Sequence, residues 1–408
     1  MSFRQALNVF ELQEIARRRL PRGVYGFVEG GVEDNQARDN NRTVFERIRF
    51  RPRAGVDVSQ RSQEVELFGR KFAAPFGIAP MGIAGVFAFD GDIQMARAAA
   101  RLKVPFTLSH MSTVPMETIA EHASHARWLQ AYLSNDRERA AKFTARAAAA
   151  GYELLMVTLD TAVGSNRENN IRNGFTLPVH ITPRLLFQGA THPRWSIEVF
   201  ARTLMKYGVP CLENTEAGDR PSILAGPDKN LRHRRDGVDW EFIRHLRDQW
   251  KGRLLVKGTL HPADAEMAVR VGLDGVVVSN HGGRQLDGAI SPIEALPEIR
   301  AAVGKNLKIL ADSGFRRGTD ILKGLALGAD FILLGRAAMF GAIAGGEEGV
   351  VHVLSLLKAE VDRDLALLGC PSIGELNPDY LETRDLFYGR VPGGATEKVR
   401  PVMAATNF

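Results

Sequence analysis

Short runs of consecutive apolar residues alternate along the chain with longer segments in which apolar residues recur every three or four positions. Each short run predicts a strand, and the runs lie at 76–80, 104–109, 127–132, 154–160, 253–257, 274–279, 307–312 and 330–335. Continuous apolar runs are typical of parallel strands that are covered on both faces. The alanine-rich segments between them have helical spacing and a glycine near their ends, which predicts helices.

Eight strand and helix units in succession predict an α/β fold, the (β/α)8 TIM barrel. The strands follow one another at intervals of roughly 20 to 30 residues, except that residues 164–236 form a long insertion after the fourth strand. We expect an N-terminal helical cap at 1–75, the barrel at 76–376 and a C-terminal tail at 377–408. Long loops at a barrel mouth are commonly lids, which is one interpretation of the insertion.

Composition narrows the class of protein. The 408 residues are 45% hydrophobic and 25% charged, which suits a soluble enzyme with a full core. The formal charge of +6 is spread among nearly as many acids, without the basic stripe and interleaved aromatics of a nucleic-acid-binding protein. The most apolar stretch, 76–89, is too short to span a bilayer, so we expect any membrane contact to be peripheral. Cys211 and Cys370 belong to no metal-spaced cluster and fit a reducing compartment, the cytoplasm.

Polar residues, glycines, one proline and one methionine finish or directly follow the predicted strands, at the end where barrel enzymes assemble their sites. These residues are Pro80, Met81, Gly82, Ser109, Gln130, Tyr132, Thr158, Asp160, Lys257, Ser279, His281, Arg284, Asp312, Gly314, Arg316, Gly335 and Arg336. Taken singly, each has an ordinary structural interpretation, such as a turn cap, a solvated lysine or an exposed arginine. Because one barrel places all of them at the same rim, we expect one convergent polar mouth.

The loops after the seventh and eighth strands predict a phosphate site. "DSGFRRGTD" and "GRAAMFG" put glycines and backbone N–H groups at helix starts, beside Arg316 and Arg336. Ser109, Gln130 and Thr158 offer neutral hydrogen bonds to a flat polar ring, and Lys257 offers a positive charge that would stabilise a reduced flavin. No G-x-G-x-x-G fingerprint opens an early strand and helix unit, so FMN fits better than a nicotinamide cofactor.

The stretch "SNHGGRQ" at 279–285 resembles the signature of the FMN-dependent α-hydroxy-acid oxidases and dehydrogenases. The resemblance covers nearly the whole chain through "LPRGVYGFVEGG", "FRPR", "TLDTAVGSNRENN", "LLVKG", "DSGFRRG" and "LLGRA". Within that family the chain is most similar to the mandelate dehydrogenase and bacterial membrane-bound L-lactate dehydrogenase branches, which share "GGRQLD" and "DSGFRRG". The resemblance also implies a homotetramer.

The resemblance implies His281 as the catalytic base and Asp160 as its partner. A carboxylate beside an imidazole holds its tautomer and stabilises the imidazolium that forms on proton uptake. Arg284 would bind the substrate carboxylate through two parallel hydrogen bonds, with Arg167 as a second cation. Tyr132 would hydrogen-bond the substrate.

The same resemblance places the flavin. Pro80, Met81 and Gly82 would line it near N5 with backbone groups, and Lys257 would lie by N1 and O2. The glycines at 282 and 283 would let the turn fold so closely that His281 and Arg284 both face the flavin.

Phe27 departs from the family pattern. The family usually has a second tyrosine in "VYDY", where it helps to hold the substrate carboxylate, but this chain reads "VYGF". Loss of that hydroxyl removes a hydrogen bond to a charged group, of order 1.5–3 kcal/mol. We therefore expect a substrate that is bulkier or more apolar than lactate, or one without a simple free carboxylate.

These observations predict FMN-dependent oxidation of an (S)-2-hydroxy acid, lactate-like or mandelate-like, to the 2-keto acid. A quinone or other carrier would then take the electrons, because the family's oxidases commonly carry alanine where this chain has Gly82. The alternatives are a 2-hydroxy-acid oxidase that uses O2, and a peptide- or cofactor-maturation flavoenzyme, or a flavin-binding protein with little turnover, on the same barrel. The intact set of His281, Asp160, Arg167 and Arg284 argues against lost catalysis.

The insertion carries a further expectation. Its segment "RWSIEVFARTLMKYG" at 194–208 predicts a helix with one basic and one apolar face. Such a helix could belong to a lid packed on the barrel mouth. Alternatively, the outer surface of residues 177–215 docks on an anionic bilayer and brings the flavin near the quinone pool. The second interpretation predicts a cytoplasmic protein bound peripherally to the inner face of the cell membrane.

Overall fold

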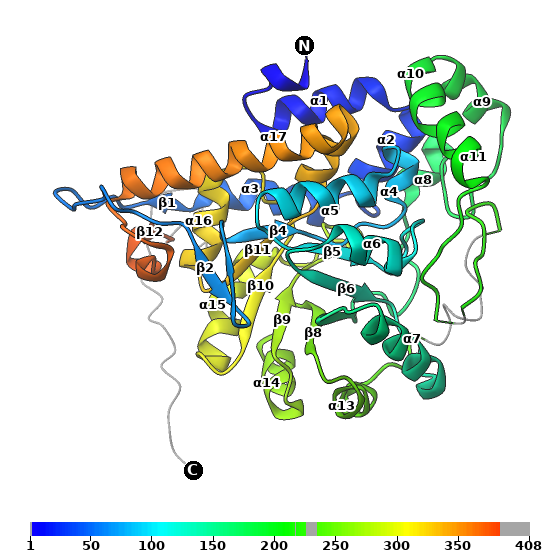
Figure 1. The fold of residues 1–408 in the computed structure, drawn as a ribbon. Coiled ribbons are helices and arrows are strands. Elements are labelled where there is room, and N and C mark those ends of the chain that lie inside the picture. The colour runs from blue at the N-terminus through cyan, green and yellow to red at the C-terminus, as the bar shows by residue number, and fades with distance from the viewer. Residues whose placement is uncertain (1, 217, 226–234, 384–408) are drawn as a thin grey trace.

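The computed structural model describes residues 2–216, 218–225 and 235–383 (Figure 1). At its centre eight parallel strands form a closed barrel in the order β10-β11-β4-β5-β6-β7-β8-β9. The strands are β4 (Phe76–Ile78), β5 (Phe106–Ser109), β6 (Arg127–Ala131), β7 (Leu154–Thr158), β8 (Arg253–Thr259), β9 (Gly275–Val278), β10 (Lys308–Ala311) and β11 (Phe331–Leu334). Each corresponds to a predicted apolar run, and the predicted (β/α)8 barrel is confirmed.

Helices cover the outside of the barrel (Figure 1). They are α4 (Ala84–Phe87), α5 (Gly91–Arg101), α6 (Met116–His122), α7 (Arg137–Ala149), α13 (Trp240–Gln249), α14 (Pro262–Val271), α15 (Pro292–Val303), α16 (Gly318–Ala326) and α17 (Arg336–Leu368). Local sequence sets several of their ends: Asp136 and Asp239 accept N-cap hydrogen bonds at α7 and α13, and Gly272 ends α14 in the left-handed conformation. The strands are therefore buried on both faces, as their apolar composition requires.

Within the described residues, α17 is the one helix long and apolar enough by composition to cross a membrane. Of its most apolar window, 56% is buried, and it packs against α1 (Val9–Arg19) and α5. Non-helical backbone at Gly345 and Gly346 also divides it into two helical pieces. Packing within the fold therefore accounts for its apolar character.

The N-terminal segment begins with helices and ends with short strands. After the 3₁₀ turn η1 (Phe3–Gln5) come α1, α2 (Arg22–Glu29), α3 (Gln36–Thr43) and the 3₁₀ turn η2 (Val44–Arg47). β1 (Arg49–Phe50) then pairs with β12 (Leu381–Glu382), and β2 (Val65–Leu67) pairs with β3 (Arg70–Phe72). The last part of the predicted helical cap is thus extended chain, while the domain boundaries at 75 and 376 stay predictions.

The β2–β3 hairpin packs on the barrel interior at the amino ends of the strands. The Phe72 ring lies 5.9 Å from that of Trp128 and 5.5 Å from that of Phe331, centre to centre. These residues belong to a second apolar cluster inside the barrel, which also includes Met156, Leu255 and Val277. The hairpin therefore covers one end of the barrel interior and leaves the opposite, carboxyl end to the cavity described below.

The insertion after β7 is helical where the structure describes it. It contains α8 (Glu168–Asn173), α9 (Pro183–Ala190), α10 (Pro193–Trp195), the π-helix η3 (Ser196–Ala201) and α11 (Arg202–Tyr207). The last three form one run, which confirms the helix predicted at 194–208. The buried Trp195 donates from Nε1 to the Val86 carbonyl (3.0 Å), so the run is anchored to α4.

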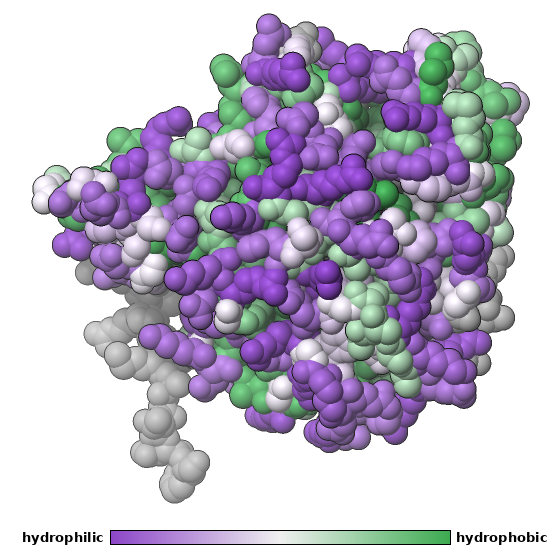
Figure 2. Space-filling view, in the orientation of Figure 1, coloured by the Kyte–Doolittle hydropathy of each residue, from purple (hydrophilic) through white to green (hydrophobic). Residues whose placement is uncertain are grey.

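Large apolar side chains of the insertion point to solvent. Ile181, Leu186, Phe187, Ile197, Phe200, Met205 and Val209, which we call the insertion patch, are between 42% and 80% exposed. In Figure 2, hydrophobic side chains gather at the edge where Figure 1 places α9, α10 and α11. Exposed apolar area of this kind marks an interaction surface.

Candidate active site

A cavity of about 460 Å³ opens at the carboxyl ends of the barrel strands, a size that suits a cofactor with a small substrate. The predicted residues that line it are Phe27, Pro80, Met81, Gly82, Gln130, Tyr132, Thr158, Arg167, Lys257, His281, Arg284, Asp312, Gly314, Arg316, Gly335 and Arg336. Ser109, Asp160 and Ser279 lie behind this lining and hydrogen-bond to Gln130, His281 and Lys257 respectively. The predicted convergence of the strand ends is therefore present.

His281 follows β9 in a left-handed conformation. Its φ is 59°, and those of Gly282 and Gly283 are 70° and 71°. Glycine adopts such angles freely, whereas histidine does so at a cost on the order of 1 kcal/mol. The backbone N–H of His281 donates to Ser279 Oγ (3.0 Å) and that of Gly282 to Ser313 Oγ (2.9 Å), which holds the turn. We call residues 279–284 the His281 turn.

His281 is arranged as a base. Its Nδ1 donates to Asp160 Oδ1 (2.9 Å), so Nε2 carries the lone pair and accepts from the Tyr132 hydroxyl (3.2 Å). Burial lowers the pKa of His281, and the negative charge of Asp160 offsets only part of that effect. Burial raises the pKa of Asp160, but the positive charges of His281 and Lys257 outweigh it and the net pKa is lowered. Near neutral pH the pair is a neutral imidazole beside a carboxylate, as a general base requires.

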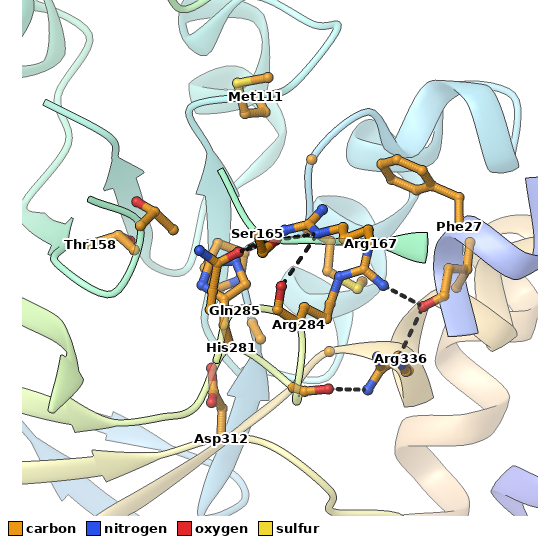
Figure 3. A pocket seen from close by; sticks show the side chains of 18 of the residues that line it. Phe27, Met111, Thr158, Ser165, Arg167, His281, Arg284, Gln285, Asp312 and Arg336 are labelled. Atoms are coloured by element: carbon orange, nitrogen blue, oxygen red, sulfur yellow. Dashed lines mark hydrogen bonds between the residues drawn. The ribbon is translucent and has the colours of Figure 1, made fainter. Parts of the chain in front are cut away.

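Two arginines place positive charge beside the imidazole (Figure 3). Arg284 donates to the Gly30 carbonyl (2.6 Å), and burial, with the charges of Arg167 and Arg336, lowers its pKa well below the usual value. Arg167 donates to Ser165 Oγ (3.0 Å) and to Gln285 Oε1 (2.8 Å). A guanidinium that is buried among other cations is stabilised by a bound anion, and a substrate carboxylate would supply one.

Phe27 forms an apolar wall next to these cations. Its ring packs against Phe87 (5.9 Å between centres) and edge-on against Phe175 (5.5 Å). Phe87 also lines the cavity, together with Met111, Val163, Ile171 and Leu177. None of these five was predicted as a site residue, because Met111, Val163 and Leu177 lie in loops and Phe87 and Ile171 lie in the short helices α4 and α8, where no sequence periodicity marks them. The end of the cavity beside Arg167 and Arg284 is consequently more apolar than the strand ends alone indicated.

The floor of the cavity fits a flavin ring. Lys257 donates to Ser279 Oγ (2.6 Å) and pairs with Asp312 (3.2 Å). Burial lowers the pKa of Lys257, but Asp312 and Asp160 outweigh burial and raise it, so the lysine stays charged. Gln130 donates to Thr158 Oγ1 (2.8 Å), which leaves a row of polar groups along the neighbouring strands.

The far end of the cavity fits a phosphate. Gly314 has a φ of 93°, which favours glycine, and Gly335 precedes the first turn of α17. Burial lowers the pKa of Arg316 to about 10, with Arg336 as a further cause, and burial also lowers the pKa of Arg336. A buried cation, Arg316, and a largely buried one, Arg336, beside a helix N-terminus form an anion site, and the residues present therefore fit FMN. When bound, FMN would accept the electrons that a substrate loses.

Sequence reasoning also missed Gln285, which directly follows the His281 turn. Its Nε2 donates to the Asp160 carbonyl (3.0 Å) while its Oε1 accepts from Arg167 and from Ser165 (3.2 Å). The signal was available, since Gln285 is the last residue of "SNHGGRQ". Among the described residues, no group of three or more His, Cys, Asp or Glu side chains is placed to hold a metal ion.

Known proteins are similar to this chain in sequence and in fold. Residues 16–383 match the family described as FMN-dependent dehydrogenase. The chain is 42% identical to (S)-mandelate dehydrogenase of Pseudomonas putida, over 92% of this chain and 93% of that protein. It is 38% identical to an L-lactate dehydrogenase of Pectobacterium atrosepticum, over 90% of this chain and 94% of that protein.

A solved structure agrees with these matches. The crystal structure described as the monotopic membrane protein (S)-mandelate dehydrogenase superposes with a TM-score of 0.87 at 42% identity, covering 93% of this chain and 100% of that one. The sequence match, the barrel and a cavity that fits FMN agree with one another. The chain therefore belongs to the FMN-dependent dehydrogenase family.

Proposed function

We propose that the protein oxidises an (S)-2-hydroxy acid to the 2-keto acid with FMN. The observation that carries the proposal is His281 Nε2, a base that faces the cavity between Tyr132 and the two cations Arg167 and Arg284. The arginines bind the substrate carboxylate, Tyr132 hydrogen-bonds the substrate, and His281 Nε2 takes up the substrate proton while Asp160 stabilises the imidazolium. Two of the compared relatives are a mandelate and a lactate dehydrogenase, which act on acids of this class.

The substrate we favour is mandelate-like, with an aromatic or branched apolar group on the hydroxyl-bearing carbon. Phe27, Phe87 and Met111 line the cavity and leave apolar surface where the family usually presents a tyrosine hydroxyl. An aromatic substituent buries area against such a wall, whereas the methyl group of lactate buries little.

We also propose that the insertion patch lies on a membrane and that a quinone or another carrier accepts the electrons. Its outer surface combines exposed apolar side chains with the basic residues Arg194, Arg202 and Lys206, the pairing that peripheral binding to anionic lipid needs. Arg202 lies 4.0 Å from the centre of the Phe89 ring and Lys206 pairs with Asp90 (2.8 Å), in the connection after β4 that also carries Gly82 and Phe87. The relative of known structure is itself a monotopic membrane protein.

Anaerobic mixing tests the proposed reaction. The FMN-loaded protein is mixed with (S)-mandelate, (R)-mandelate, L-lactate and glycolate, and flavin absorbance near 450 nm is followed. We expect rapid bleaching with (S)-mandelate, slower bleaching with L-lactate and none with (R)-mandelate. Absence of bleaching with every acid would contradict the proposal. If a soluble quinone restores the flavin absorbance quickly and O2 restores it slowly, the result would support a dehydrogenase over an oxidase. Size measurement in solution would test the expected homotetramer.

A further inference from the structure

A pair of buried asparagines joins the N-terminal segment to the His281 turn. Asn41, on α3, donates from Nδ2 to Asn280 Oδ1 (2.8 Å), and Asn280 donates from Nδ2 to Asn41 Oδ1 (2.8 Å). The two residues are 239 positions apart in the chain and are 2% and 4% exposed. Neither was a candidate site residue in the sequence, and neither lines the cavity.

Asn280 directly precedes His281, and its amide supports the strained turn. Asn280 Oδ1 accepts from the backbone N–H of Gly283 (3.1 Å) as well as from Asn41, and its Nδ2 donates to the Ile290 carbonyl (3.2 Å) as well as to Asn41. Both donors and both acceptor positions of the amide are therefore used. A reversed amide would direct N–H against the N–H of Gly283, so Gly283 and Ile290 fix which way the Asn280 amide faces, and Asn41 pairs with the donor and acceptor positions that remain.

The backbone of α3 also lies directly under this turn. A Cβ built on Gly283 would lie 2.3 Å from the Arg38 nitrogen, so the two backbones are in contact. The Ala37 N–H donates to Asp287 Oδ1 (2.8 Å) just beyond the turn. Three consecutive left-handed residues persist only where their surroundings fix them, and α3 supplies a large part of those surroundings.

We infer that Asn41 is a positioning residue for catalysis: through Asn280 it holds the turn that aims His281 at the substrate and Arg284 at its carboxylate. The inference rests on the proposed role of His281 as the base. A base displaced by about 1 Å loses much of its effectiveness, so a group outside the cavity can control the rate.

Two substitutions at position 41 separate this role from simple packing. Asn41→Leu keeps the approximate volume and removes both hydrogen bonds; we expect flavin reduction at saturating substrate to slow at least ~10-fold, with FMN content unchanged. Asn41→Asp can imitate the amide only when protonated, because the carboxylate cannot donate to Asn280 Oδ1. Burial raises the pKa of such a carboxyl, so we expect its rate to fall as pH rises toward neutrality. The wild-type rate, by contrast, should rise with pH below about 6.5 and be independent of pH above it.

The matched control is Asn40→Ala. Asn40 is the neighbouring asparagine on α3, and its Nδ2 donates to Glu294 Oε2 (2.8 Å), away from the His281 turn. We expect Asn40→Ala to change thermal stability without changing the rate per bound FMN or its pH profile. A purely structural role for Asn41 predicts the same pattern for both asparagines.

A second readout does not depend on turnover. With ¹³C-labelled histidine, the imidazole resonance of His281, identified by its loss in His281→Gln, is titrated in the wild type and in the position 41 variants. We expect Asn41→Leu to shift this titration, and Asn41→Asp to shift it only above the pKa of the new carboxyl. Wild-type titration together with wild-type rates in both variants would overturn the inference. If the wild type itself is not bleached by any hydroxy acid while the titration still shifts, the proposed function fails and the positioning of His281 by Asn41 stands.

Discussion

The guanidinium carbon of Arg284 lies 5.3 Å from the centre of the Phe27 ring, so the cation expected to bind the substrate carboxylate rests on an aromatic face rather than beside a hydroxyl. Such cation–π contact orients the guanidinium and contributes about 0.5–2 kcal/mol. The Phe27 ring itself has no group that can donate a hydrogen bond to an anion. We therefore expect carboxylate binding in this protein to depend on the two arginines and Tyr132, and Phe27 to contribute apolar contact to the rest of the substrate.

Phe27→Tyr should favour small substrates. The added hydroxyl makes the wall smaller and more polar, which disfavours an aromatic substituent, while its hydrogen bond to the carboxylate, worth about 1.5–3 kcal/mol in general, is available to both acids. We expect the ratio of kcat/KM for L-lactate to that for (S)-mandelate to rise about tenfold, from steady-state assays with an artificial acceptor. Tyr25→Phe is the control, because it changes a hydroxyl on the same helix that contacts Gln13 instead (3.3 Å). An unchanged ratio in Phe27→Tyr would show that residue 27 does not touch substrate.

His281→Gln should keep FMN and lose flavin reduction. Glutamine retains polarity and approximate size but cannot accept the proton, and general-base catalysis typically contributes 10²–10⁴-fold, roughly the loss we expect. Stopped-flow absorbance under anaerobic conditions measures the rate, and the visible spectrum measures FMN content. His180→Gln, at an exposed position, serves as the control. Bleaching of His281→Gln at near the wild-type rate would refute the role of the base.

The pH profile should be limited by His281 on the acid side. Burial keeps the pKa of this imidazole below 6.5, so the base is neutral above that pH and is lost only as pH falls through the lowered value. We expect flavin reduction to be independent of pH from 8 down to about 6.5 and to fall below it. The free energy of unfolding should also decrease as pH falls, because the unfolded chain, with the higher histidine pKa, takes up the proton first. A rate that falls already between pH 8 and 7 would contradict the neutral imidazole.

Asp160→Asn should separate the two effects of the carboxylate. Without its negative charge the pKa of His281 drops further, so the acid limb of the profile moves to lower pH. The imidazolium also loses its stabilising partner, and we expect the plateau rate to fall on the order of 100-fold. Stopped-flow rates measured from pH 5 to 8 report both quantities. A slower plateau with an unmoved acid limb would mean that Asp160 acts by orientation alone.

The insertion patch should bind anionic vesicles. We expect the wild type to co-sediment with phosphatidylglycerol vesicles at low salt, and a Phe187→Gln, Ile197→Gln, Met205→Gln variant to stay in the supernatant with flavin reduction intact. The matched control makes the same kind of substitution at Leu7 and Leu367, which lie outside the insertion and are 73% and 69% exposed. Replacement of residues 177–215 by a short linker should have the same effect as the triple variant. A wild type that does not sediment would exclude this surface as the membrane contact.

The barrel could be predicted because its strands are buried on both faces. Such strands are continuous apolar runs in the sequence, as at 274–279. The position of His281 followed from the rule that sites form at the carboxyl ends of such strands. By contrast, β2 and β3 have three residues each, too few to show a period. Asn41 lies in a polar helix that resembles a solvated one, and only the folded chain shows that its partner is 239 residues away.

The apolar wall could not be predicted for a related reason. Phe87, Met111 and Ile171 come from the connections after three different strands, where Phe87 ends the short helix α4 and Ile171 lies in the short helix α8, and none of them stands out singly in the sequence. Phe27 was recognised only because it replaces a tyrosine of a familiar motif. Side chains that meet through loop conformation leave no spacing signal, whereas those set by strand ends do.

The pairing of β1 with β12 has a consequence for synthesis of the protein. Phe50 is in register with Leu381, so the strand that follows α3 meets its partner only when nearly the whole described chain has emerged from the ribosome. Until then, the N-terminal helices that carry Phe27 and Asn41 have no anchor at this point. We expect the barrel to close first during folding and its mouth to be completed last. FMN would then bind late, after most of the chain has folded.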